Sequence, residues 1–433
     1  MGNHAKRAGV LSILFMGLGQ FYNRQLIKGI FFALIELAYI IFMLPYTVGS
    51  IHGLITLGDT PQKMVGGKIV QGDHSIFLMV FGIIAIIVLF IFAVIYFINV
   101  KDATGVGKLR DRGGEPNKLR ASIKNLYDRG FPYLLLTPAG LFTLFLTVVP
   151  LIFGIMIAFT NYSSPNHLPP RALVDWVGFE NFVNLIRIKS IGSTFAGVAL
   201  WTLIWALLST ASTFFVGLLV AVIINANNIV LKKFWRSIFI LPWAVPGFIS
   251  ILVMRNMFNG QFGPINQYLT AIGISPIPWF ADPTWAKITC LLVNLWLGFP
   301  YFMAMMSGVL TGIPKDLYEA ASIEGANSKQ KFRKITLPMV LFSTAPLAIS
   351  SFAYNFNNFT LIYLLNSGNP TNTGYFYAGH TDILLSWLYK LTLEQSQFHM
   401  ASVVSIIIFL FIASISAVNY LNTRAFKEED MIQ

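Results

Sequence analysis

Charged side chains are scarce in this sequence, at 11% of its 433 residues. Soluble globular proteins average about 25%. Hydrophobic residues make up 55% of the chain, and its mean hydropathy is +0.67. Because so few charges cannot cover a protein surface in water, we expect a lipid bilayer as the solvent. The net charge of +12 then indicates Lys and Arg retained on the cytoplasmic side, and we expect no nucleic-acid partner.

The groups that metal sites and enzymes need are missing or scattered. The one cysteine, Cys290, lies in an apolar run, which excludes a disulfide within the chain and a cysteine-based metal site. The six histidines show no HxxxH or HExxH spacing, so we expect no metal. No GxxxxGK[ST] motif is present, so the chain has no ATP site of its own. A membrane-embedded enzyme would need paired carboxylates or a metal set at membrane depth, and neither is found.

Long apolar runs are abundant. Eight segments reach the roughly 20 residues that a membrane-spanning helix requires. Several of them contain proline, which membrane helices tolerate because neighbouring groups satisfy the freed carbonyls. The pattern predicts an all-α membrane protein with kinked helices around a cavity. The expected spans are 27–48, 76–99, 132–160, 196–224, 237–257, 286–310, 339–365 and 397–421.

Lys and Arg concentrate before residue 29 and in the segments 100–130, 225–237 and 311–338. Placing the N-terminus inside puts most of the 30 basic residues on the cytoplasmic side, as the positive-inside rule requires. Both termini and the loop 311–338 are then cytoplasmic. The predicted organisation is an N-terminal interfacial segment (1–26), two leading helices (27–99), a basic cytoplasmic linker (100–130), a six-helix domain (131–425) and a cytoplasmic tail (426–433).

The loop 311–338 predicts a helix, a bend and a second short helix. Pro314 suits a first helical turn, and Glu319-Ala320-Ala321 favours helix. Gly325 permits a backbone turn that other residues resist. Phe332 and Ile335 then share one face of a second helix. An ordinary amphipathic connector is the alternative interpretation.

The membrane segments of the six-helix part carry almost no acidic or basic side chains. Carriers driven by protons or sodium usually keep such groups at membrane depth. Glu36 is the one acid inside a predicted span, and it lies in a leading helix. The pattern therefore disfavours ion coupling, as in a secondary carrier, and a strongly charged cargo.

Amides and aromatics stand in these segments instead. They cluster in 294–301 (NLWLGFPY), in 351–359 (SFAYNFNNF) and at Trp243. Aromatic faces stack on sugar rings, and amides both donate to and accept from hydroxyl groups. A neutral, polar, ring-shaped cargo fits this chemistry. Helix–helix association through asparagine hydrogen bonds is the alternative.

The loop string E-A-A-x-x-E-G-A-x5-F-x2-I-x-L-P, which starts at Glu319, resembles the "EAA" loop of membrane subunits of ATP-binding-cassette (ABC) importers. The two aromatic–amide strings resemble those of the larger membrane subunit of maltose/maltodextrin importers. This resemblance implies a MetI-like, type-I importer fold with two leading helices. It implies coupling to an ATPase through Glu319, Ala320, Ala321, Gly325, Ala326, Phe332 and Pro338. It implies sugar binding by Trp243, Gly247, Asn294, Leu297, Gly298, Tyr301, Tyr354, Asn355 and Asn358.

The resemblance also implies partners. These are a second permease subunit, an ATPase homodimer that binds ATP-Mg, and an extracellular sugar-binding lipoprotein. Trp243 stands where the enterobacterial proteins usually have tyrosine, and Gly247 where they have serine, so the preferred chain length is open. The outer loop 161–195 is short, which favours the cell membrane of a single-membrane bacterium. Another neutral oligosaccharide or glycoside remains an alternative cargo, and a secondary sugar carrier a remote alternative mechanism.

Overall fold

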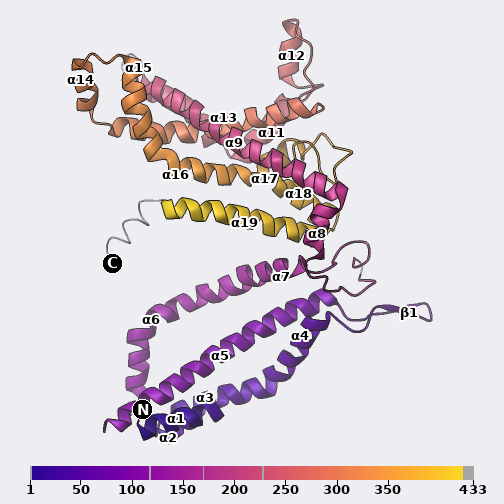
Figure 1. Ribbon diagram of the computed structural model, residues 1–433, viewed down its shortest axis with the longest axis vertical. Helices are drawn as coiled ribbons and strands as arrows, with labels where there is room; N and C mark the ends of the chain where they lie inside the picture. Colours follow the sequence, from indigo (N-terminus) through magenta and orange to yellow (C-terminus); the bar gives the residue numbers. More distant parts are fainter. Residues whose placement is uncertain (1, 117–118, 169, 227–228, 423–433) are drawn as a thin grey trace. The chain divides into compact units, whose positions relative to one another are not determined.

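The computed structural model describes residues 2–116, 119–168, 170–226 and 229–422, which are mostly helical (Figure 1). The chain divides into two compact units, residues 1–178 and 179–433. The predicted six-helix domain was expected to start at residue 131, so its first span lies in the first unit. The predicted domain boundaries themselves stay predictions.

The first unit contains three long helical stretches and one small hairpin. The hairpin strands are antiparallel, with Lys63 opposite Val70, and the sequence did not predict them. A π-helical turn joins α3 to α4 and another joins α6 to α7. The elements are α1 (Asn3–Leu14), α2 (Leu18–Tyr22), α3 (Leu26–Ala38), η1 (Tyr39–Met43), α4 (Leu44–Thr56), β1 (Lys63–Val65), β2 (Lys68–Val70), α5 (Ser75–Asp111), α6 (Leu119–Thr143), η2 (Leu144–Val148) and α7 (Val149–Ile157).

The N-terminal segment contains the short helices α1 and α2, of which α1 packs along α5. Small residues allow the close approach: a Cβ on Gly107 would lie 2.6 Å from the Ala5 Cα. The Asp111 carboxylate accepts hydrogen bonds from the His4 and Ala5 backbone N–H groups at 3.0 and 3.1 Å. Those N–H groups have no partner inside α1, because they lie in its first turn. The expected interfacial placement of residues 1–26 stays a prediction.

The second unit is built around α9 and α13, with the remaining helices packed on these two. Its elements are α8 (Glu180–Arg187), α9 (Lys189–Asn225), α10 (Lys232–Ala244), α11 (Gly247–Met257), α12 (Pro264–Ala271), α13 (Pro283–Gly312), α14 (Lys315–Ile323), α15 (Ser328–Lys331), η3 (Phe332–Thr336), α16 (Leu337–Phe356), α17 (Phe359–Asn366), α18 (Leu384–Tyr389), η4 (Lys390–Glu394) and α19 (Phe398–Asn422).

Seven helices among the described residues are long and apolar enough to cross a membrane, and eight if one bent pair counts as a single span. The protein is thus a multi-pass, all-α membrane protein, as predicted. The expected span 237–257 is that bent pair: α10 and α11 meet at an angle of 89°. Val245 is extended because proline disfavours the helical conformation in the residue before it, here Pro246.

The expected span 339–365 is also interrupted. It consists of α16 and α17, separated by Asn357 and Asn358. No proline explains this break, because α16 runs on through Pro346 just as α13 runs on through Pro300. Instead, the Asn358 side chain accepts a hydrogen bond from the Leu361 N–H at 3.3 Å and caps α17.

Candidate functional site

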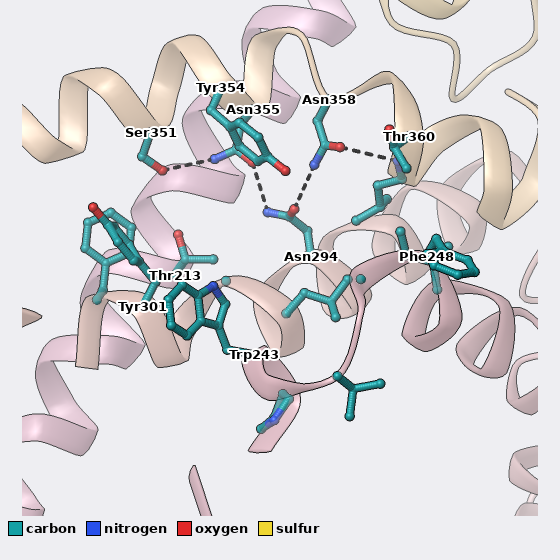
Figure 2. Close-up of a pocket in the computed structure, with 18 of the residues that line it drawn as sticks. Thr213, Trp243, Phe248, Asn294, Tyr301, Ser351, Tyr354, Asn355, Asn358 and Thr360 are labelled. Atoms are coloured by element: carbon teal, nitrogen blue, oxygen red, sulfur yellow. Dashed lines mark hydrogen bonds between the residues drawn. The ribbon is translucent and has the colours of Figure 1, made fainter. Parts of the chain in front are cut away.

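A cavity of about 800 Å³ in the second unit opens between the two interrupted helix pairs (Figure 2). The breaks place non-helical backbone at its wall. Backbone that leaves helical geometry at membrane depth is tolerated only where it is buried in protein or lines a water-filled cavity. The lining comes from α9, α10, α11, α13, α16 and α17.

All nine residues that the resemblance assigned to sugar binding line this one cavity. The structure therefore brings them together, and their role as ligands stays a prediction. The cavity wall also contains polar and aromatic residues outside the predicted set. Ser351 belongs to the string 351–359 but was not assigned to sugar binding, and Ser350 could have been found because it lies one helical turn before Tyr354. No sequence signal points to Thr213 on α9. The residues that were not predicted include Thr213, Phe248, Ser350 and Thr360.

The three asparagines of the cavity hydrogen-bond to one another. Asn294 donates to the Asn355 Oδ1, and Asn358 donates to the Asn294 Oδ1, both at 3.3 Å. Asn355 also donates to the Thr210 Oγ1 at 3.1 Å. At most 8% of each asparagine is exposed. Much of their hydrogen-bonding capacity is thus used to join α13, α9 and the α16–α17 break. This is the helix–helix association that was the alternative to sugar binding.

The aromatic residues are the accessible groups of the site. Tyr354 is 70% exposed, Trp243 60% and Tyr301 36%. The rings of Trp243 and Tyr301 lie 6.3 Å apart between centroids and are tilted by 45°. Such faces offer apolar area for stacking, while the hydroxyl and indole N–H groups offer hydrogen bonds. The wall can therefore hold a ring that is apolar on its faces and polar at its edge.

The two glycines of the predicted set differ in what they do. A Cβ on Gly298 would lie 2.7 Å from the Thr213 Cγ2, so this glycine permits the close packing of α13 on α9. A Cβ on Gly247 would meet nothing within 4 Å. Nothing in the described part of the chain therefore requires glycine at position 247, and its absent side chain enlarges the cavity.

The cavity wall has no acidic or basic side chain among its described residues. A charged cargo would have to leave water without a compensating charge, which is costly. The site therefore suits a neutral polar cargo. The geometry offers binding and no covalent chemistry, and no metal-binding cluster of acidic, histidine or cysteine residues occurs in the described residues.

The segment after α13 is the predicted helix–bend–helix. Helix α14 ends in a Schellman motif: the Ala326 N–H donates to the Ala321 carbonyl at 2.8 Å and the Gly325 N–H to the Ser322 carbonyl at 3.0 Å. Gly325 has φ +78°, in the left-handed region. Asn327 and Gln330 then form a reciprocal capping box that starts α15.

The two arms of this segment are tied together. The Tyr318 and Thr336 hydroxyls lie 2.8 Å apart, and Lys331 donates to the Ser322 Oγ at 2.6 Å. Phe332 is half-buried against the core cluster of Phe214, Leu218 and Met306. Of the predicted coupling residues, Glu319, Ala320, Gly325 and Pro338 are exposed, and Ala321, Ala326 and Phe332 are half-buried.

No residue of α14 is buried, and Ile323 is 88% exposed. Leu317 is also exposed, at 43%. A short helix with apolar side chains in solvent gains little stability alone. This surface therefore has the character of a docking site for another protein.

Comparisons with known proteins define the class. Residues 213–427 match the family "Binding-protein-dependent transport system inner membrane component". The chain is 41% identical to the galactooligosaccharides transport permease GanP of Bacillus subtilis, over 98% of this chain and 99% of that one. It is 42% identical to the maltodextrin transport permease MalC of Streptococcus pneumoniae, over 98% and 97% of the two chains.

The fold agrees with these relatives. A chain of a bacterial alginate ABC transporter, solved with an alginate pentasaccharide-bound periplasmic protein, superposes with a TM-score of 0.56 at 21% identity, covering 70% of this chain and 97% of that one. This chain belongs to the family of binding-protein-dependent transport permeases. It is a permease subunit of an ABC sugar importer and not an enzyme, because a separate ATPase hydrolyses ATP in such systems.

The asparagine network and the exposed aromatics should respond differently to mutation. We expect Asn355→Leu to lower the unfolding temperature of the purified protein, since Thr210 and Asn294 lose a buried partner at a cost of about 1–3 kcal/mol. Tyr354→Leu, on the next residue, should leave it nearly unchanged because Tyr354 is 70% exposed. Thermal unfolding in detergent measures both. Equal unfolding temperatures in the two variants would contradict the assigned structural role of Asn355.

Proposed function

We propose that this chain forms one half of the translocation pore of an importer for neutral oligosaccharides, with maltodextrins as the cargo. The observation that carries the proposal is the cavity between the broken helices, whose wall combines exposed aromatics with amides and lacks acidic and basic side chains. The nine residues Trp243, Gly247, Asn294, Leu297, Gly298, Tyr301, Tyr354, Asn355 and Asn358 form the sugar site.

Galacto-oligosaccharides are the second candidate cargo. The galactooligosaccharide and maltodextrin permeases are similar to this chain at 41% and 42% identity. Both cargoes are neutral and have hydroxyl-bearing rings, so the chemistry of the wall accommodates either. Trp243 and Gly247, the positions that depart from the enterobacterial pattern, are the first residues to examine if the cargo is not maltodextrin.

The proposed assembly contains a second permease subunit, an ATPase homodimer that holds ATP-Mg, and an extracellular sugar-binding lipoprotein. Charge placement supports an orientation with both termini and the α14–α15 segment in the cytoplasm. The exposed helix α14 docks on the ATPase there. Full-length similarity to proteins of Bacillus and Streptococcus supports the cell membrane of a single-membrane bacterium. The permeases alternate between outward and inward access as the ATPases close and reopen.

Reconstitution tests the proposal directly. Proteoliposomes would hold this chain, the second permease and the ATPase in the membrane. ATP would be enclosed in the lumen, and the binding protein would be added outside. Uptake of maltodextrins that requires both ATP and the binding protein is the expected result. Uptake of galacto-oligosaccharides instead of maltodextrins would support the proposed importer and show that its cargo is different. Uptake that stops with a protonophore while ATP remains would overturn the ATP-driven mechanism.

Gly325 should control coupling through its backbone. Left-handed geometry costs most L-residues roughly 1–2 kcal/mol, whereas Asn adopts it more readily. We expect Gly325→Val to lower uptake about tenfold while ATP hydrolysis by the complex continues. Gly325→Asn is the matched control and should retain most uptake. Since a Cβ here meets nothing within 4 Å, equal loss in both variants would show that the side chain, and not the backbone, matters.

A further inference from the structure

A second polar cavity, of about 600 Å³, lies beyond the first along the same two helices. Helix α11 contributes Phe248 and Ile251 to the first cavity and Leu252 and Asn256 to the second. Helix α17 likewise contributes Leu361 to the first and Leu365 and Asn366 to the second. Along α11, residues 248 and 256 are separated by roughly 12 Å. The two cavities thus lie one after the other along α11 and α17.

The second cavity is rich in hydrogen-bonding groups. Arg255 is exposed and, among the described residues, makes one side-chain bond, to the Leu364 carbonyl at 3.4 Å. A guanidinium has five N–H donors. The Asn256 amide is exposed and has no side-chain partner in the described part of the chain. Asn259 uses its Oδ1 to accept from the Gln261 and Phe262 N–H groups, which leaves its NH₂ group available.

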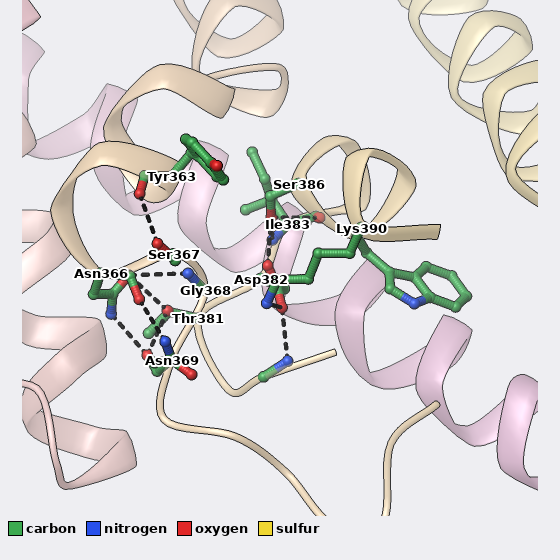
Figure 3. Close-up of polar contacts among 12 residues, drawn as sticks. Tyr363, Asn366, Ser367, Gly368, Asn369, Thr381, Asp382, Ile383, Ser386 and Lys390 are labelled. Carbon is green, nitrogen blue, oxygen red and sulfur yellow. Dashed lines mark hydrogen bonds and ion pairs between the residues drawn. The ribbon is translucent and has the colours of Figure 1, made fainter. Parts of the chain in front are cut away.

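The opposite wall is fixed in place by the loop after α17 (Figure 3). Asn366 donates to the Asn369 carbonyl at 2.7 Å and accepts from the Thr381 Oγ1 at 3.2 Å. The same loop is held by the ion pair of Asp382 with Lys390, at 2.6 Å. A preorganised wall loses little entropy when a ligand binds. Phe280, a half-buried lining residue, adds an aromatic surface.

We propose that this second cavity is an additional subsite for the distal units of longer oligosaccharides. The remaining N–H groups of Arg255 and the amide groups of Asn256 and Asn259 bind hydroxyl and ring oxygens of sugar units that extend beyond the aromatic site. One guanidinium surrounded by amides suits a neutral ligand with many hydroxyl groups. Such a ligand offers several weak hydrogen-bond acceptors to these donors, where an anionic ligand would offer one charged group. In the proposed orientation the subsite is at the extracellular end, where cargo enters. The inference rests on the proposed function and adds to it a dependence of transport on the chain length of the oligosaccharide.

Chain-length dependence of uptake tests the subsite. In the reconstituted complex, Arg255→Ala should lower hexasaccharide uptake about tenfold more than disaccharide uptake, because losing hydrogen bonds from a charged donor weakens only the ligand that reaches it. The probes are maltose and maltohexaose, or galactobiose and galactohexaose if wild type transports that series. Arg187→Ala is the matched control: it removes an exposed cation from α8 that lines neither cavity, and its ratio should equal that of wild type.

The other outcomes are distinguishable. If Arg255→Ala lowers uptake of both lengths equally and also weakens stimulation of the ATPase by the sugar-free binding protein, the cavity contacts the binding protein and the subsite is wrong. An unchanged ratio with unchanged stimulation likewise overturns it. Absence of uptake of every oligosaccharide by the wild-type complex would instead contradict the proposed function. Asn256→Ala, at an exposed position on the same helix, repeats the test without altering charge.

Discussion

The cavity of the second unit depends on how the chain satisfies its backbone where α16 gives way to α17. Each unpaired peptide group in hydrocarbon costs several kcal/mol. Here the Asn358 N–H donates to the Asn355 carbonyl at 3.1 Å, and the fully buried Trp205 donates its indole N–H to the same oxygen at 2.9 Å. The Asn357 side chain also donates to the Ala353 carbonyl at 3.5 Å, and the Asn358 side chain accepts from the Leu361 N–H at 3.3 Å. These backbone groups at the break therefore have hydrogen-bond partners, and the break can line an open cavity.

The distribution of charge also follows from the cost of burying polar groups away from water. The chain carries a net charge of +12, yet the walls of the aromatic cavity have no acidic or basic side chain among the described residues. A neutral cargo needs no counter-charge, so the protein avoids burying one. Arg255 appears only in the second cavity, where it is exposed to solvent. Hydroxyl recognition by a charged donor is thus confined to a place where the charge remains hydrated.

The sequence predicted the fold class and the members of the main cavity well, because both depend on local patterns. Long apolar runs mark spans irrespective of packing, and the strings around Asn294 and Asn355 carried the resemblance. The breaks were harder to predict. Pro242, Pro246, Pro300 and Pro346 look alike in sequence, yet only at Pro246 do two helices meet at a sharp angle.

What separates the breaks from the continuous helices is tertiary. The interruption at Asn357 contains no proline and relies on Trp205 and Asn294, which lie about 150 and 60 residues away along the chain, respectively. Nor could spacing show that the asparagines bind one another. Amides in apolar segments indicate that polar groups meet inside the protein. Their hydrogen-bond partners, however, lie on helices that are distant in sequence.

The exposed segment α14–α15 connects α13 and α16, which both line the cavity. Helix α13 holds Asn294 and Tyr301 and leads through Ile313 and Pro314 into α14, and η3 leads directly into α16, which holds Asn355. The Tyr318–Thr336 contact joins α14 to the end of η3, directly before α16, so a displacement of α14 would also act on the start of α16. Asn355 lies roughly 28 Å along the helix from Thr336, so a small rotation at the segment becomes a larger displacement at the cavity wall.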